Sequence, residues 1–173
     1  VNGVLTNWYS LYNKTAFVGK SGTLTKASSN IEYINWSTYT AATDTGSFTV
    51  DDNDSTIITY SNQLSNTPHA RLSGILNFRI NITVPDSIYD SNDSIDIYTN
   101  YVKKNYNEDT WTTPTLNSLE NRLTLLKGQK NAMIILPVLS TNYVGDSYKL
   151  AINAPAGVKF YVYLSASLTD RDI

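Results

Sequence analysis

The chain has 173 residues, enough for one domain with a sizeable core, and we expect residues 1–173 to form a single domain. Its formal net charge is -2, and no basic run exceeds Lys103-Lys104, which argues against a nucleic-acid partner. It has no cysteine, and its longest apolar run, 132–139, is far shorter than the roughly 20 residues of a membrane span, so we expect neither disulfides nor membrane insertion.

The N-terminal part contains short β-prone runs separated by turn residues. The sequence opens on Val1 without an initiator methionine, from which we expect a domain processed or excised from a larger protein. TAFVG and GTLTK predict two short strands, and IEYINWSTYTAA predicts a third. GSFTV and TIITYS flank an acidic cluster at 51–55, which is typical of a hairpin-like unit.

The clearest strand signal is ARLSGILNFRINITV, residues 70–84. Its side chains alternate between apolar positions, such as Phe78 and Ile80, and polar ones, namely Asn77, Arg79 and Asn81. A two-residue period predicts a half-buried strand, and Pro85 should end it. The polar face would meet water in a monomer or line a subunit contact in a trimer.

The C-terminal half continues the strand pattern. SIDIYTNYV, RLTLL, SYKLAINA and VKFYVYLSASL each predict a strand, the last with Tyr161 and Tyr163 outward. NAMIILPVLS is apolar on both faces, which predicts a central strand. With roughly nine or ten short strands and no convincing helical period, the sequence predicts an all-β antiparallel sandwich or jelly roll.

The long polar connection at 103–121 is the preferred binding region, because connections of this length are often functional. Tyr and Trp give large contact areas at low entropic cost. We therefore expect a ligand-binding loop built from Tyr101, Asn105, Tyr106, Asn107 and Trp111. In the alternative interpretation, these rings only cap an open end of the sandwich.

No catalytic signature is present. His69 is the single histidine, so a Ser-His-Asp triad would have to use it, with Asp86 among the carboxylates near in sequence. We interpret His69 as a strand-end residue making one hydrogen bond. The aspartate clusters do not match a calcium-binding loop. We therefore expect no enzyme activity, no metal and no cofactor.

The order of ARLSGILNFRINITV, RLTLLKGQ, GDSYKLAINA and FYVYLSASL resembles the jelly-roll heads of the C1q and tumour-necrosis-factor type, and jelly-roll domains on virus and phage surfaces, over about residues 70–168. The resemblance implies an extracellular or virion-surface attachment module, frequently trimeric, that recognises a cell-surface glycan or protein. Some protruding domains of insect picorna-like capsids carry a His-Ser pair. Here Ala70 follows His69, which puts hydrolase activity in doubt.

Four functions follow as hypotheses. The preferred one is a virion-surface attachment domain that binds a host receptor. The others are a carbohydrate-binding module of a secreted protein, a structural capsid component without a ligand, and an esterase or protease using His69. Oligomeric state separates the first two, because an attachment head of this type is expected as a trimer and a carbohydrate-binding module as a monomer.

Overall fold

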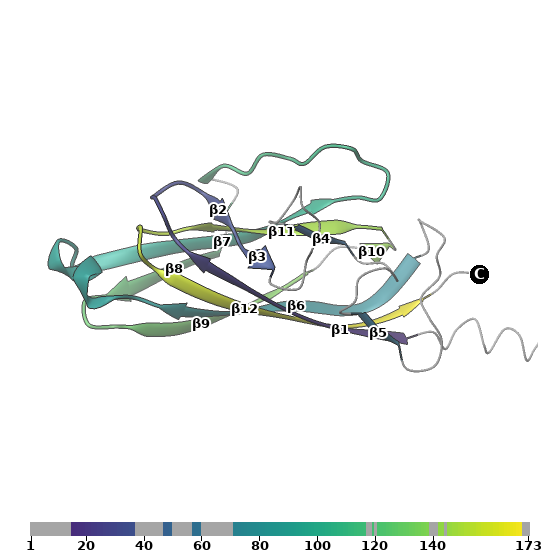
Figure 1. Cartoon of the computed structure of the whole chain (residues 1–173), viewed down its shortest axis with the longest axis horizontal. Helices are drawn as coiled ribbons and strands as arrows, with labels where there is room; N and C mark the ends of the chain where they lie inside the picture. The colour runs from purple at the N-terminus through teal and green to yellow at the C-terminus, as the bar shows by residue number, and fades with distance from the viewer. Residues whose placement is uncertain are drawn as a thin grey trace, which may run out of the picture.

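The computed structural model describes residues 15–36, 47–49, 57–59, 71–116, 119, 121–138, 142–143 and 145–170, and the described residues form two antiparallel β-sheets that pack face to face (Figure 1). The twelve strands of this part of the chain are β1 (Thr15–Thr25), β2 (Glu32–Tyr33), β3 (Asn35–Trp36), β4 (Ser47–Thr49), β5 (Ile57–Thr59), β6 (Arg71–Thr83), β7 (Ser94–Lys104), β8 (Asn121–Leu126), β9 (Asn131–Pro137), β10 (Asn142–Tyr143), β11 (Ser147–Asn153) and β12 (Lys159–Asp170). A short 3-10 helix, η1, spans Asp86–Asp90.

The strands pair in a nested order. The first strand, β1, pairs with the last, β12; β2 and β4 pair with β11; β6 pairs with β9; and β7 pairs with β8. Seven strands form one sheet around β6, β12 and β1, and five form the other around β11 and β7. This wrapping of nested antiparallel pairs over two sheets is a jelly roll, as the sequence predicts.

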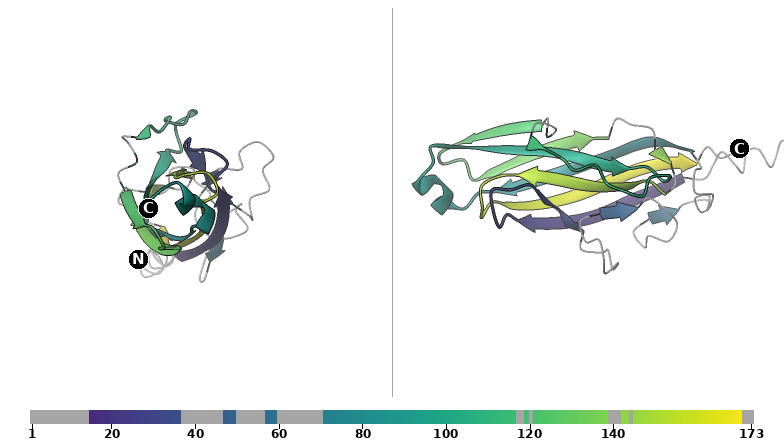
Figure 2. Two further views of the ribbon diagram at one scale, coloured as in Figure 1. Left: turned by 90° about the vertical axis from the view of Figure 1, so that its left-hand side faces the viewer. Right: turned by 90° about the horizontal axis from the view of Figure 1, so that it is seen from above.

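The strand predicted at 70–84 is confirmed as β6, which ends at Thr83 just before Pro85. Its apolar side chains lie between the sheets, where Phe78 and Ile80 are fully buried. It runs antiparallel to β12, with Ile80 opposite Val162. The strands lie along the long axis of the molecule (Figure 2). The two-residue alternation therefore fixes which face of β6 enters the core.

Aromatic rings fill the middle of the sandwich. Trp36 contacts Phe48 edge to face at 5.1 Å between ring centroids, and Phe48 stacks on Tyr148 at 5.6 Å. Phe78, from the opposite sheet, lies 6.2 Å from Phe48. These rings come from β3, β4, β6 and β11, so they join segments distant in the sequence.

Four expectations are corrected. GSFTV and TIITYS do not pair as a hairpin, because β4 pairs with β11 and β5 pairs with β1 in the other sheet. The single strand predicted in IEYINWSTYTAA is divided into β2 and β3, which belong to different sheets.

TAFVG and GTLTK are parts of one continuous strand, β1, because Gly19, Lys20 and Ser21 continue the ladder with β12. The segment predicted to be a central strand, β9, lies at the edge of the seven-stranded sheet and pairs only with β6 among the described strands. Its second apolar face is exposed, with Ile135 61% accessible.

The described part of the chain contains no helix that is long and apolar enough to cross a membrane. The connection from β7 to β8 runs along the outer side of the five-stranded sheet (Figure 1).

Candidate functional site

Strand register places three functional side chains on the outer face of the five-stranded sheet. Lys149 of β11 lies opposite Val102 of β7, and Lys104 lies opposite Ser147, so the two lysines are diagonal neighbours across these strands. Tyr33 of β2 is diagonal to Lys149 on its other side, because it pairs with Ala151. Diagonal side chains of this kind are within reach of each other on one face of a sheet.

Trp111, from the β7–β8 connection, lies against the two lysines. The Lys149 ammonium is 4.6 Å from the centroid of the Trp111 ring and 5.0 Å from that of Tyr33. The Lys104 ammonium is 5.2 Å from the Trp111 centroid. All four side chains are half-buried. We call Tyr33, Lys104, Trp111 and Lys149 the tryptophan platform.

Asp146 binds the start of the β7–β8 connection through its side-chain carboxylate. Its carboxylate is fully buried and accepts the backbone N–H of Tyr106 at 3.0 Å and that of Tyr143 at 2.8 Å. The Lys103 ammonium lies 3.2 Å from it. Tyr106 also packs its ring on Tyr143, with the centroids 5.5 Å apart. The buried carboxylate therefore ties the end of β7 to the turn before β11.

The five residues predicted to form a binding loop do not converge on one point. Tyr101 faces inward, with its ring 6.1 Å from that of the buried Tyr148 and packed against the core. The Asn105 amide donates a hydrogen bond to Glu108, 2.5 Å away, within the turn. Asn107 is exposed, and Tyr106 is oriented toward β10.

Trp111 is thus the predicted residue that belongs to the platform. Its partners Tyr33, Lys104 and Lys149 were not among the predicted site residues. A signal for Lys149 exists in the alternation of SYKLAINA, which puts it on the face opposite Tyr148 and Leu150. The pairing with Trp111 depends on how the connection folds back, which no local pattern shows.

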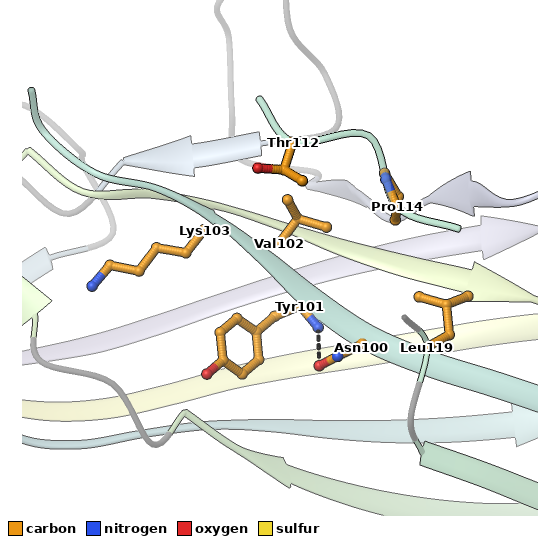
Figure 3. A pocket seen from close by; sticks show the side chains of 7 residues that line it. All are labelled: Asn100, Tyr101, Val102, Lys103, Thr112, Pro114 and Leu119. Carbon is orange, nitrogen blue, oxygen red and sulfur yellow. Dashed lines mark hydrogen bonds between the residues drawn. The ribbon is translucent and has the colours of Figure 1, made fainter. Parts of the chain in front are cut away.

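A cavity of about 220 Å³ adjoins the platform (Figure 3). Val102 and Thr112 point toward one another across it, whereas Tyr101 is turned to the other side of β7 (Figure 3). Asn100 and Pro114 also line it. The carbonyl oxygen of the Asn100 side chain accepts the N–H of Tyr101 at 2.9 Å. The cavity therefore lies between β7 and the returning connection, one residue beyond Trp111.

The seven-stranded sheet carries a contrasting surface on its outer side. Three aliphatic side chains there are more than half exposed, and two tyrosines are more than a third exposed: Ile75, Met133, Ile135, Tyr161 and Tyr163. Arg79 lies between β9 and β12 on this side, with its guanidinium 5.7 Å from the Tyr163 centroid. We call these five apolar and aromatic residues the outer apolar face.

Few of the residues considered for catalysis or metal binding lie in the described ranges. His69 lies outside them. Asp86, considered as its partner, is exposed at the start of η1 and pairs with the Lys130 ammonium at 2.9 Å. No group of three or more His, Cys, Asp or Glu side chains within these ranges could hold a metal ion.

Comparisons with known proteins show only weak likeness to solved structures. No family model matches the chain, and no curated protein matches it. Among solved structures, the one described as Eiger TNF from S. frugiperda aligns over 91% of this chain and 94% of its own length, with 12% sequence identity and a TM-score of 0.34.

Proposed function

We propose that this domain is a non-enzymatic attachment head that recognises a cell-surface glycan or protein, as on the surface of a virion or in another extracellular setting. The observation that carries the proposal is the tryptophan platform on the outer side of one sheet, with the outer apolar face on the other. A half-buried tryptophan and tyrosine with cationic neighbours are typical of recognition surfaces.

The outer apolar face supports self-association, and we propose that it contacts a second copy of this chain. Soluble monomers rarely expose contiguous apolar patches of large area. Ile135, Met133 and Ile75 are each exposed by more than half, and their described neighbours on the sheet carry no acidic side chain. The Arg79 guanidinium on this face lies against the Tyr163 ring. A mostly apolar surface of this kind suits a copy of itself, and a cyclic trimer is the arrangement that we propose.

A monomeric carbohydrate-binding module is the second candidate, and Trp111 favours it equally. The outer apolar face distinguishes the two, because a module that works as a monomer has no use for it. A purely structural capsid component would use the outer apolar face and leave the tryptophan platform without a role.

Trp111→Ala tests the attachment proposal. We expect at least about a tenfold loss of binding to cultured cells or to a glycan array, because truncating a central aromatic removes a dominant part of a binding surface. Flow cytometry with the labelled domain measures its binding to cultured cells. Tyr98→Ala is the matched control, since Tyr98 lies on the same sheet and also contacts one cation, Arg122, at 5.9 Å.

Unchanged binding of Trp111→Ala, with its melting temperature preserved, would contradict the assignment of this surface. Equal losses for Trp111→Ala and Tyr98→Ala would also contradict it, because the effect would then not be local to the platform.

A further inference from the structure

The backbone of β9 bonds to β6 through every second residue. The Val84 N–H donates to the Lys130 carbonyl oxygen at 2.8 Å, and the Val138 N–H donates to the Leu76 carbonyl oxygen at 2.9 Å. Both bonds keep the register of the β6–β9 ladder. Hydrogen-bonded and non-hydrogen-bonded pairs alternate along an antiparallel ladder. The even-numbered residues of β9 therefore direct their N–H and C=O groups to β6.

The odd-numbered residues of β9 direct their backbone groups to the other side, along the margin of the sheet (Figure 1). They are Asn131, Met133, Ile135 and Pro137, the last of which has no N–H. Among the described strands, none pairs with this margin, which we call the β9 edge. The Met133 and Ile135 side chains are also 58% and 61% exposed. The β9 edge therefore presents backbone groups and apolar side chains together.

The margin of the other sheet, formed by β8, is protected in ways that the β9 edge is not. The Leu126 N–H donates to the Gln129 side-chain oxygen at 2.7 Å, and Arg122 brings a charge that pairs with Asp96. Charged side chains and covered backbone groups keep an edge strand from pairing with another chain. Residues 131–137 contain no charged side chain. An apolar edge of this kind is a template for a further strand.

From this contrast we infer that the β9 edge pairs with the β9 edge of a second copy of the chain. Two antiparallel copies of β9 fit each other about a two-fold axis, with Met133 of one copy opposite Ile135 of the other. In this register the two residues exchange both of their N–H···O=C bonds, because their outward groups form hydrogen-bonded pairs. The two seven-stranded sheets then continue into each other.

The composition of β9 favours a second copy over a charged foreign strand. Pairing places the Met133 and Ile135 side chains of the two copies within reach of each other on one face. A charged side chain buried beside them would cost free energy, and β9 brings none.

The edge contact is distinct from the trimer proposed through the outer apolar face. It uses backbone groups and a two-fold axis, whereas the trimer uses side chains around a three-fold axis. Edge pairing alone gives a dimer, and edge pairing between trimers gives a pair of trimers. The number of chains in the assembly is therefore even in both cases. The inference does not depend on the attachment function.

Met133→Pro tests the edge contact, because proline removes an outward N–H and leaves the bonds from Ala132 and Ile134 to β6. Light scattering coupled to size exclusion measures the mass of the full chain. We expect an even number of chains for the wild type and half of that mass for Met133→Pro. Met133→Ala is the matched control, since it truncates the same side chain but keeps the N–H, and its mass should equal that of the wild type.

Hydrogen exchange on the wild type gives a second measurement, which covers the case in which Met133→Pro does not fold. The Met133 and Ile135 amides should exchange at least tenfold more slowly in the paired state than after dilution to separated copies, because pairing protects them. The Ala132 and Ile134 amides bond to β6 within one copy, so they should be protected in both states.

A wild-type mass of one or three chains would overturn the inference, as would an unchanged mass for a folded Met133→Pro. Equal losses of mass in Met133→Pro and Met133→Ala would also overturn it, because side chains rather than the backbone would then join the copies. Protected Met133 and Ile135 amides in a monomer would show that another segment of the same chain covers the edge, and would overturn it too.

The same masses separate this inference from the proposed trimer. A mass of three chains leaves the trimer standing without the edge contact. A dimer that Met133→Pro separates into monomers contradicts the trimer and keeps the edge contact.

Discussion

The hydroxyl of Thr99 is buried and has no hydrogen-bond partner among the described residues. The side chain is fully buried within the five-stranded sheet, facing the core between Ile97 and Tyr101. A buried hydroxyl that makes no hydrogen bond carries the cost of leaving water, about 1–3 kcal/mol.

Thr99→Val should therefore stabilise the domain by about 1 kcal/mol, because valine has the same shape without the hydroxyl. Urea unfolding followed by tryptophan fluorescence measures the change. Thr124→Val is the contrasting variant, since the Thr124 hydroxyl donates to Asp96 at 2.6 Å and its loss should not stabilise. A destabilised Thr99→Val would mean that the hydroxyl has a partner after all.

Glu32 makes folding stability depend on pH. Burial raises the pKa of its carboxyl, but the backbone N–H groups of Ala27 and Ser28 and the Lys26 ammonium outweigh burial and hold that pKa below its usual range. A carboxyl with a lowered pKa stabilises the fold above its unfolded-state pKa of about 4.3, and this contribution is lost as the pH falls through the folded-state pKa.

We expect the unfolding free energy of the wild type to fall more steeply between about pH 5 and 3 than that of Glu32→Gln. Lys26 does not contribute to this difference, because it is protonated in both states throughout that range. Urea titrations at several pH values measure the slopes. Parallel slopes for the two proteins would rule out Glu32 as a source of acid sensitivity.

At the scale of elements, Gly22 allows β3 to approach β1. A Cβ atom built on Gly22 would lie 2.8 Å from the carbonyl oxygen of Asn35 and 2.9 Å from the Trp36 ring. Gly22 also pairs with Val162 of β12 on its other side. Because the oxygen belongs to the backbone, the clash could be relieved only by moving the strand.

Gly22→Ala should destabilise the domain by about 1–3 kcal/mol, the usual range for forcing an extra carbon into a packed site. Thermal unfolding measures this loss of stability. Thr23→Ala, at the exposed neighbouring position, is the control and should change stability by less than about 1 kcal/mol. If both variants unfolded at the wild-type temperature, the close contact of β1 and β3 would be wrong.

Asp146 connects three elements, so its charge matters for the β7–β8 connection. Asp146→Asn keeps the shape but leaves the half-buried Lys103 ammonium without its carboxylate and weakens the hydrogen bond from Tyr106. We expect a loss of about 3 kcal/mol, because removing the charge of one partner of a buried ion pair is strongly destabilising.

The double variant Asp146→Asn/Lys103→Met should recover part of that loss, and a double-mutant cycle from urea unfolding measures the coupling. Additive losses would contradict a direct pairing of Asp146 with Lys103.

Sequence patterns predict elements whose two faces differ and misplace those whose faces are alike. The alternation of β6 fixes its place in the core, because one face is apolar and the other polar. NAMIILPVLS has two apolar faces. From the local pattern alone, a strand covered on both faces cannot be distinguished from an edge strand that has one apolar face exposed. The inward turn of Tyr101 and the contact of Trp111 with Lys149 depend on strand pairing distant in the sequence.

For the whole molecule, the two sheets present different surfaces on opposite sides. The residues of the outer apolar face belong to β6, β9 and β12, and those of the tryptophan platform to β2, β7, β11 and the β7–β8 connection. Figure 1 shows the two sheets to which these strands belong on opposite sides of the molecule. Self-association through the first leaves the second accessible. A trimer would therefore present three platforms, and weak single-site affinities would combine into strong attachment.

Ile135→Asp should convert the proposed oligomer to monomers, because a charge buried in an apolar contact costs several kcal/mol. Light scattering coupled to size exclusion measures the mass. Leu126→Asp is the matched control, since Leu126 is also 61% exposed but belongs to the other sheet. A wild-type monomer, or equal effects of both variants, would contradict the assignment of the outer apolar face.

The nested pairing also decides when the fold can form. In the seven-stranded sheet, β12 lies between β6 and β1 and pairs with both. β6 and β1 therefore cannot be joined in one sheet until residues 159–170 have been synthesised. Contacts between such distant parts of the chain give a high contact order, and folding on the scale of milliseconds to seconds. During translation, the seven-stranded sheet therefore cannot be completed until β12 has left the ribosome.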